Sequence, residues 1–456
     1  MKFENIFTEK RVGSDKPSSG TRSGFQRDFD RLIFSSAFRR LQNKTQVFPL
    51  PGTAFVHNRL THSLEVASVG RSLGKMIGAR ISETYKSNEE VYEFYHYELA
   101  NVIAAACLAH DIGNPAFGHS GEKAISNYFI ENADAKIDGQ QLKNFFSEKE
   151  WSDLTSFEGN ANAVRTLTHQ FRGRFKGGFG LTYTTIASIL KYPCESIATN
   201  KKIRHRKKYG FFQTEKETAL VIMRELQMIE ESSEPVIFKR HPFVYLVEAA
   251  DDICYSIVDM EDAHRLKILT KKEVEDSFLY VVEKLDKDSI DKTCNYYQNI
   301  EDTSEAIAFL RARIINLLVN KCTDVFWDCQ ADILNGNFDD TLLDNVDKNF
   351  QALKPIQKIS QERIYQHDTV IQIEIAGYNV MSELLSLFIP ALLKKKPSHK
   401  EQKIFRLFPY QFTEFEQTSS FYEKVMNALD FLSGMTDEYA TELYRKLKGI
   451  VIPRHD

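Results

Sequence analysis

The chain has 456 residues, of which 42% are hydrophobic and 27% charged, and its formal net charge is -4 at pH 7. These values are typical of a soluble globular protein that can form one large domain or two. The near balance of 59 basic and 63 acidic residues argues against a protein whose main task is to coat nucleic acid or an anionic membrane.

The cysteines and the N-terminus bear on the compartment. The six cysteines form no CxxC pair and no disulfide-framework spacing, and the N-terminal MKFENIFTEKRVG lacks the apolar stretch of a signal peptide. The longest apolar run, at 384–393, contains Pro390 and is too short to cross a bilayer. We therefore expect a cytoplasmic protein with no membrane partner.

Apolar residues that recur about every 3.6 residues predict helices along most of the chain. The best β-branched run, VIQIEIAGY at 370–378, merges into a helical pattern. We therefore expect an all-α fold with at most a small β-ribbon. The predicted helices cover residues 28–42, 60–81, 97–110, 121–131, 215–232, 243–265, 271–287, 303–325 and 368–393.

Histidines and other residues that suggest chemistry lie mainly before residue 290 of the chain. SDKPSSGTRSG at 14–24 favours a mobile arm, so we assign residues 1–24 to it. After a softer boundary near residue 290, histidines are fewer and no chemical cluster stands out. We therefore expect a catalytic domain at 25–290 and, packed on it, a helical C-terminal region at 291–456 that supplies substrate or oligomer contacts. Proline and glycine predict loops at 49–52, 113–118, 172–180 and 193–210.

An adjacent His110 and Asp111 end the strongly apolar helix NVIAAACLAHDIG, which Gly113 and Pro115 then stop. Both side chains at such a helix end can turn toward one cation, with an imidazole nitrogen and a carboxylate oxygen as ligands. This mixed donor set suits Mn, Fe, Co, Mg or Zn. The dipeptide alone is weak support for a metal site.

Two further segments strengthen that interpretation. His62 begins another apolar helix, and Glu248, Asp251 and Asp252 interrupt an otherwise buried helix with three carboxylates. Because an unpaired buried carboxylate is costly, this pattern asks for a cation or an arginine. The alternative is an acidic helix face exposed to water.

Several long motifs, in order, resemble the deoxynucleoside-triphosphate triphosphohydrolases of the HD superfamily, and most closely their bacterial dGTP triphosphohydrolase group. They are RRLQNKTQVFPL, HDIGNPAFGHSGE, FEGNANAVR and EAADDICYSIVDMED. The resemblance is good over residues 22–265 and diffuse beyond. It implies an HD-domain helical bundle with additional C-terminal helices. It also implies metal-dependent hydrolysis of dNTPs, with dGTP preferred, to a deoxynucleoside and inorganic triphosphate.

Matched motif by motif, the resemblance implies a divalent metal, Mn or Mg first and Fe, Co or Zn as alternatives, held by His62, His110, Asp111 and Asp251. The helical phase supports Asp251 over Asp252. Asp251, Tyr255 and Asp259 recur at i, i+4 and i+8 and share one helix face. Asp252 would point about 100° away from that face.

The resemblance assigns the catalytic pair to His119 and Glu122. A histidine titrates near neutral pH and can act as a general acid, while Glu122 could fix its tautomer and raise its pKa. Their loop leads into a helix N-terminus, which favours phosphate. One departure is Asn114, where many relatives have histidine: asparagine is no comparable proton donor.

Other matched positions would bind the substrate. Arg59, Lys191 and Lys208 match phosphate contacts, with Tyr192 and Asn160 as weaker matches. Lys208 lies in the basic stretch KKIRHRKK, which otherwise reads as a solvated loop or a dock for single-stranded nucleic acid, a regulatory ligand in some relatives.

The same resemblance assigns a deoxyribose pocket to Gln46, Tyr255 and Asp259. Gln46 and Asp259 would bond the 3′ hydroxyl, and the Tyr255 ring would exclude a ribose 2′ hydroxyl. Segments 362–385 and 405–412 are candidates for reading the base, which the sequence leaves open. Relatives imply a homo-oligomer, often a hexamer.

Two other functions stay open. One is an HD phosphohydrolase that acts on another nucleotide, such as a monophosphate, an alarmone or a cyclic dinucleotide. The other is a nucleic-acid-binding regulatory protein with a degenerate site. The deoxyribose residues favour the dNTP hydrolase over the first, and the intact metal and catalytic positions favour it over the second.

Overall fold

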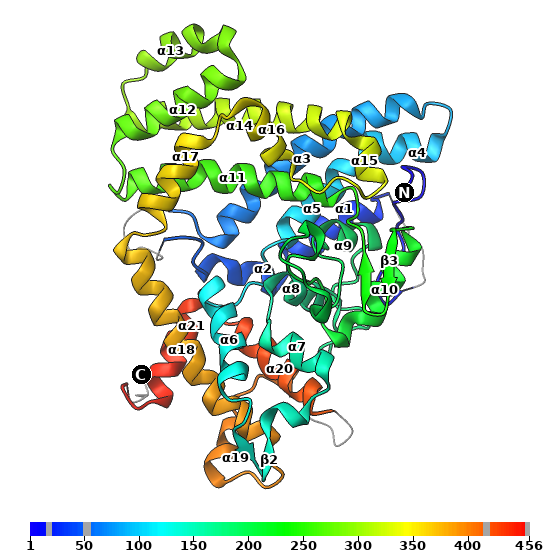
Figure 1. Cartoon of the computed structure of the whole chain (residues 1–456), viewed down its shortest axis with the longest axis vertical. Helices are drawn as coiled ribbons and strands as arrows, with labels where there is room; N and C mark the ends of the chain where they lie inside the picture. Colours follow the sequence, from blue (N-terminus) through cyan, green and yellow to red (C-terminus); the bar gives the residue numbers. More distant parts are fainter. Residues whose placement is uncertain (15–20, 49–55, 414–419, 452–456) are drawn as a thin grey trace.

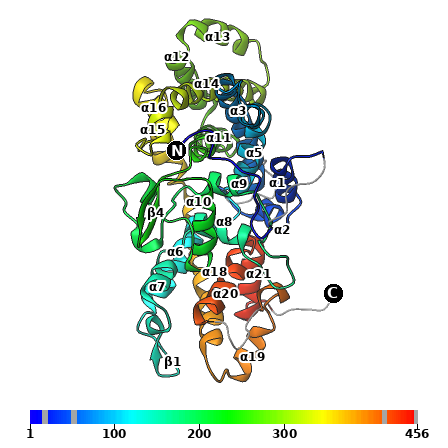
Figure 2. The same ribbon diagram turned by 90° about the vertical axis from the view of Figure 1, so that its right-hand side faces the viewer.

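The computed structural model describes residues 1–14, 21–48, 56–413 and 420–451 of the chain. The molecule is elongated and almost entirely helical, with helices α12 to α14 at one end and α19 at the other (Figures 1 and 2). Two antiparallel two-stranded ribbons are the only sheets among these residues. The predicted all-α fold is therefore confirmed, with two small ribbons where at most one was expected.

The first half of the fold is built on a tight pair of helices, α3 and α5. Gly70, Gly74 and Gly78 lie on the face of α3 that meets α5. A Cβ atom at Gly74 would lie 3.0 Å from the Ala100 Cα. Because these glycines have no side chain, the helices approach closely, and α11 then packs on α3. The helices of this half are α1 (Gly24–Ile33), α2 (Ser36–Arg40), α3 (Arg59–Thr84), α4 (Glu89–Glu93), α5 (Leu99–Ala109), α11 (Val244–Arg265), α12 (Lys271–Leu285), α13 (Ile290–Gln298), α14 (Thr303–Asp328), α15 (Gln330–Leu334), α16 (Leu342–Phe350) and α17 (Lys354–Ile359).

The second half gathers around α18, which packs against α6, α20 and α21 (Figure 1). Its apolar cluster and that of the first half each contain residues from before and after position 290. Both parts of the chain thus contribute to each core. The remaining helices are α6 (His119–Glu131), α7 (Glu148–Thr155), α8 (Gly159–Thr168), α9 (Tyr183–Ile189), α10 (Lys216–Glu225), α18 (Asp368–Leu393), α19 (His399–Phe405), α20 (Phe421–Ser433) and α21 (Asp437–Leu447); the strands are β1 (Lys136–Ile137), β2 (Gln140–Gln141), β3 (Glu230–Ser233) and β4 (Val236–Phe238).

Helix boundaries differ from the predictions at a few places. The helix predicted at 28–42 is two helices, because Ser35 caps the start of α2. The one predicted at 215–232 ends at Glu225, and the chain then turns at Gln227, whose φ is 50°, into strand β3. The predicted loop at 49–52 lies outside the described residues.

Helix α18 spans 368–393 as predicted, and it absorbs both the β-branched run and Pro390. Within the described chain it is the one helix long and apolar enough to cross a membrane by length and composition. Half of its apolar window is buried in the protein, which is expected of a core helix.

The N-terminal segment packs against the body of the molecule. Phe3 and Ile6 are buried, and Arg11 forms a buried ion pair with Asp28 at 2.7 Å. The part of the expected arm that precedes residue 15 is therefore packed structure.

Asp437 and Ser433, near the end of the chain, bind the two loops that lead into helices α3 and α6. The Asp437 carboxylate, at the start of α21, accepts the backbone N–H groups of Thr45 and Phe117, each at 2.8 Å. The buried Lys44 Nζ donates to the carbonyl oxygens of Asn114 and Ser433. The loops that enter α3 and α6 are thereby held by the end of α20 and the beginning of α21.

Candidate metal and nucleotide site

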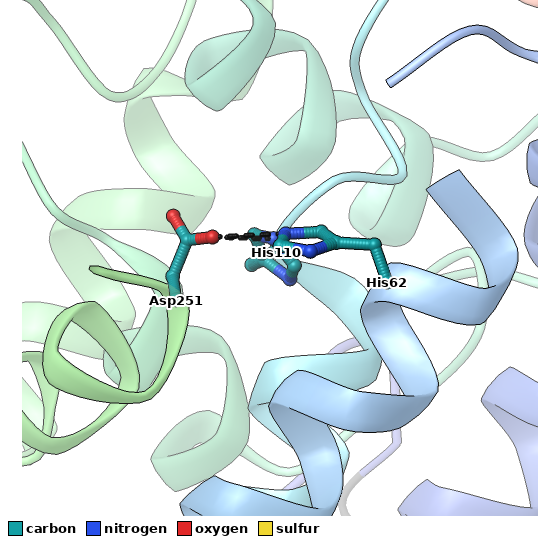
Figure 3. Close-up of side chains that lie close together, drawn as sticks. All are labelled: His62, His110 and Asp251. Atoms are coloured by element: carbon teal, nitrogen blue, oxygen red, sulfur yellow. Dashed lines mark hydrogen bonds and ion pairs between the residues drawn. The ribbon is translucent and has the colours of Figure 1, made fainter. Parts of the chain in front are cut away.

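His62, His110 and Asp251 meet from three different helices (Figure 3). His62 lies in the first turn of α3, His110 ends α5, and Asp251 lies in α11. One Asp251 oxygen is 3.0 Å from His62 Nε2 and 3.5 Å from His110 Nε2. One ligand atom from each residue lies within 4.8 Å of the others. Such a cluster can close around one divalent cation.

The chemistry of His110 fits a cation. Its Nδ1 lies 2.6 Å from the Cys107 carbonyl oxygen, which can only accept, so the hydrogen is on Nδ1 and the Nε2 lone pair faces the cluster. That Nε2 atom is buried without a hydrogen bond. Burial lowers the pKa of His110, but Asp111 and Asp251 outweigh burial and raise it to about 9. The surroundings therefore favour positive charge at this point.

The two adjacent aspartates differ. Burial raises the pKa of Asp251, but His110 and His62 hold it well below its ordinary range. Asp252 is outside the cluster; burial and the nearby carboxylates of Glu248 and Asp251 raise its pKa to about 8, against the opposing charge of Lys191. The member of the pair that faces the histidines is the one that the helical phase indicated.

Asp111, the fourth predicted ligand, lies beside the three-residue cluster. Its carboxylate accepts from Arg59 at 2.8 Å and from the Asn114 amide at 2.5 Å, and its Oδ1 is 3.6 Å from His110 Nε2. Burial raises the pKa of Asp111, but Arg59 and then His110 lower it below the ordinary value. Asn114 thus acts as a donor that orients the Asp111 carboxylate.

A cleft of about 650 Å³, partly open to solvent, runs alongside this cluster. Its walls come from both halves of the chain, because four residues of the C-terminal region join residues near the metal cluster. The lining residues are Thr45, Gln46, Val47, Arg59, Phe117, Gly118, His119, Tyr255, Tyr365, Val370, Ile373 and Glu374.

Tyr255 and Tyr365 form one end of this cleft. Their rings stack with centroids 5.8 Å apart, and the Tyr365 hydroxyl donates to Asp259 at 3.0 Å. Burial raises the pKa of Asp259 to about 8, so that this carboxyl is neutral at pH 7. The Gln46 Oε1 atom is buried without a hydrogen bond. This end of the cleft therefore offers stacked rings and unused polar groups.

His119 and Glu122 begin α6 but do not pair as the sequence suggested. Glu122 accepts the Gly159 N–H at 2.7 Å, and burial and then Glu158 raise its pKa to about 7. The expectation that Glu122 raises the pKa of His119 is wrong: burial, Lys208 and Arg59 lower it. His119 is exposed into the cleft. It is therefore a neutral imidazole near pH 7 in this state.

Arg59 lines the cleft, but the other expected phosphate contacts lie outside its lining, and Lys191, Lys208 and Asn160 are bound to carboxylates. Lys208 Nζ is 2.8 Å from Glu158, which also accepts from the Asn160 amide at 2.6 Å. Lys191 Nζ is 3.1 Å from Glu248. The ring of Tyr192 is buried, with the Arg240 guanidinium 5.8 Å from its centroid.

Sequence reasoning missed the roles of three residues of this neighbourhood. Glu158 stood inside the FEGNANAVR motif, but its role as a lysine partner was not visible; Glu248, in contrast, was expected to need a cation or an arginine and pairs with Lys191 and Arg240. Arg240, which binds Glu248 at 2.9 Å, and Tyr365 carried no local signal. His57, left ambiguous by its spacing, is bound between Asp262 at 2.9 Å and Glu65 at 3.2 Å and does not line the cleft.

The chain matches the model of one protein family, the HD domain, over residues 59–203. That span contains His62, His110, Asp111, His119 and Glu122 and ends before Asp251. HD domains bind divalent metal ions.

Relatives align over nearly the whole chain. A deoxyguanosinetriphosphate triphosphohydrolase-like protein of Synechocystis is 37% identical over 99% of this chain and all of the relative. A protein of the same name from Pseudomonas aeruginosa is 36% identical over 98% of this chain and 99% of the relative. The deoxyguanosinetriphosphate triphosphohydrolase of Yersinia enterocolitica is 31% identical over 93% of both chains. The chain therefore belongs to the HD-domain phosphohydrolases, in the family of these triphosphohydrolase-like proteins.

Proposed function

We propose that this HD-domain phosphohydrolase splits deoxynucleoside triphosphates, with dGTP as the leading substrate, into deoxynucleoside and inorganic triphosphate. The observation that carries the proposal is on α11. Asp251 faces the metal cluster, Tyr255 lines the cleft, and Asp259 accepts a hydrogen bond from the cleft residue Tyr365; all three follow one another on a single helix. One helix would therefore hold both the metal centre and a sugar pocket that has no room for a 2′ hydroxyl.

His62, His110 and Asp251, with Asp111 beside them, would hold Mn or Mg. A bound divalent ion would supply a polarised water and neutralise charge at the α-phosphate. The hydrogen on His110 Nδ1 supports this assignment, because it leaves Nε2, which makes no hydrogen bond, directed at Asp111 and Asp251.

The chain's own residues would then handle phosphate and proton. Arg59, bound to Asp111, lies in the wall of the cleft and can contact a phosphate with its second edge. His119 is exposed into the cleft at the N-terminus of α6, where phosphate is favoured. Once triphosphate raises its pKa, the imidazolium can donate the proton that the departing 5′ oxygen needs.

Lys191 and Lys208 would exchange partners when the triphosphate binds. Each is held by a carboxylate in this structure, Lys191 by Glu248 and Lys208 by Glu158. A triphosphate carries more charge than either carboxylate, so both ammonium groups gain by turning toward it. Glu122 and Glu158 would then lose the positive charge of Lys208 that lies beside them.

The sugar and base would occupy the other end of the cleft. Asp259 and Gln46 can bond the 3′ hydroxyl, and the Tyr255 ring would exclude a 2′ hydroxyl. Val370, Ile373 and Glu374, from the segment expected to read the base, line this end within the same chain, whereas the other candidate segment, 405–412, does not. A homo-oligomer, expected to be a hexamer, is part of the proposal, and light scattering of the purified protein measures it.

One assay tests the function. The purified protein is incubated with each dNTP and with GTP, in Mn or Mg, and the products are separated. Deoxynucleoside with triphosphate supports the proposal. Pyrophosphate or monophosphate as product would contradict the assigned bond, equal use of GTP would contradict the sugar pocket, and single-strand binding without turnover would favour a regulatory protein.

A further inference from the structure

A second cavity lies behind the loop that carries Asp111. Counted out to open solvent it measures about 660 Å³, and it shares no lining residue with the cleft beside the metal cluster. Helices α2, α8 and α20 and the glycine-rich loop at 172–180 form its walls. We call it the rear cavity. Its lining residues are Ser36, Ala37, Arg40, Lys44, Ile112, Asn162, Thr166, His169, Phe171, Arg174, Gly178, Phe179, Gln411, Phe412, Asp430, Ser433 and Gly434.

The charges in the rear cavity do not balance. No carboxylate among the residues that the structure describes pairs with Arg40 or Arg174. The one acidic residue of the lining, Asp430, is already neutralised, because Arg165 donates to both of its oxygens at 2.8 and 2.7 Å. Burial and then the charge of Arg174 lower the pKa of Arg40, so these guanidinium groups act on each other. Together they form an excess of positive charge that an anion would relieve.

The rest of the lining has a different chemistry. The rings of Phe171, Phe179 and Phe412 supply apolar walls that suit a planar group. Asn162 is 3% exposed, and its Oδ1 atom has no hydrogen-bond partner. An orphaned buried acceptor is costly and calls for a donor. One ligand with an anionic group, a ring and a donor would match all three features.

Two residues of the inner wall of the rear cavity bind the loop at 113–114, directly after Asp111 and Ile112. Asn162 Nδ2 donates to the Gly113 carbonyl at 2.6 Å, and Lys44 Nζ donates to the Asn114 carbonyl at 2.6 Å. Both also bind Ser433, through its hydroxyl and its carbonyl. A ligand that bonds Asn162 therefore acts directly on the backbone that positions Asp111 and Asn114.

We propose that the rear cavity binds a small organic anion with a planar ring and a hydrogen-bond donor, and that its binding is coupled to metal binding at the cluster of His62, His110 and Asp251. Arg40 and Arg174 hold the anionic group, the phenylalanines hold the ring, and Asn162 accepts from the donor. This site extends the proposed function but does not depend on the substrate, because its readouts are binding equilibria.

The dye 8-anilinonaphthalene-1-sulfonate has all three features and reports binding by fluorescence. Titration of the intact full-length protein is expected to saturate at one dye per chain. Arg40→Ala and Arg174→Ala should each weaken binding about tenfold, since a charge-assisted bond is lost. Arg172→Ala is the matched control: Arg172 lies in the same loop over the Tyr410 ring, outside the cavity lining, and should change the affinity less than twofold.

The outcomes separate clearly. Non-saturating binding, or equal affinity in all three arginine variants, would overturn the proposed site. If phenyl phosphate displaces the dye and benzoate does not, the ligand is phosphorylated. If only benzoate displaces the dye, the ligand is a carboxylate. If neither displaces the dye, the cavity is not an anion site. Thr166→Trp, which fills the cavity, should abolish binding. If that variant does not fold, Arg174→Ala still decides, because Arg174 is exposed.

Coupling is measured by repeating the titration with saturating Mn and with chelator. Since linkage between two sites is reciprocal, the dye affinity should differ at least threefold between the two conditions. An unchanged affinity would refute the coupling while leaving the binding result in place. Neither measurement uses catalysis, so a failure here is distinct from a failure to hydrolyse dNTPs.

Discussion

The two ends of the nucleotide cleft are built in different ways. The metal end is polar, and its residues lie at helix termini and on one helix face within residues 59–251. The sugar end is aromatic, and part of it comes from residues 365–374, which follow α11 in the chain only after six further helices, α12 to α17. On the proposed function, the reaction would depend on a compact, locally specified set of residues, whereas selectivity for the sugar would depend on how the C-terminal region packs on α11.

The largest effect is expected at the metal end. Asp251→Ala removes the carboxylate that faces both histidines and should reduce turnover roughly 10³-fold or more, with loss of bound metal. Product release measured with Mn, together with the metal content of the purified variant, checks this. Asp252→Asn is the matched control and should retain activity within a few-fold. If the two variants lost activity equally, the choice of ligand between the adjacent aspartates would be wrong.

The next effect separates proton transfer from metal binding at the same end. His119→Ala should reduce kcat roughly 10²- to 10⁴-fold while the metal content stays normal, because only the proton donor is lost. Added imidazole should restore part of the rate. His96→Ala, at the start of the α5 segment and outside the cleft, serves as control. Activity of His119→Ala within five-fold of the parent would rule out the proposed donor.

The third test addresses the sugar end. Tyr255→Ala opens the space that a 2′ hydroxyl would need, so the ratio of kcat/KM for GTP to that for dGTP should rise roughly 10- to 100-fold. Metal content and dGTP cleavage position should stay the same. Tyr365→Phe keeps the stacked ring and removes only the bond to Asp259. A Tyr255→Ala protein that still rejects GTP would contradict the assignment of sugar selectivity to Tyr255 at this end of the cleft.

The smallest effect is one of stability at the sugar end. Asp259 keeps its proton in the folded protein to about pH 8, whereas an unfolded chain loses it near 3.9. Between these values the folded state binds the extra proton, so stability falls as pH rises. Asp259→Asn cannot titrate at this position, so its free energy of unfolding should fall less than that of the parent between pH 5 and pH 9. Thermal unfolding of the metal-free proteins from pH 5 to 9 measures it; parallel curves would contradict the assignment.

The extent to which the sequence predicts this site follows the same division. His62, His110 and Asp251 could be assigned because the family resemblance marks their motifs and because helix phase, a local property, separates Asp251 from Asp252. The bond between Asp259 and Tyr365 joins residues 106 apart and depends on how α17 and the helical turn after it pack on α11, which no local pattern encodes. The direction of the His119 pKa was missed for a related reason, since Lys208 and Arg59 approach it from distant segments.

The fold shows the same limit. The 3.6-residue spacing located α18 and α11 almost to the residue, because their apolar faces are long. It extended α10 across the turn at Gln227, since Leu226, Met228 and Ile229 continue the apolar pattern beyond the end of the helix. The packing of residues 1–13 was not foreseen, because isolated residues such as Phe3 and Ile6 show no periodicity.

Asp437 gives the molecule an order of assembly. Its carboxylate bonds the backbone at Thr45 and Phe117, the two loops that lead into the helices of His62 and His119. A ribosome must therefore synthesise Asp437 before either loop can take its final position. The nascent chain can form the helices that carry the histidines long before that point, but its catalytic cleft closes late, after the first half has left the exit tunnel.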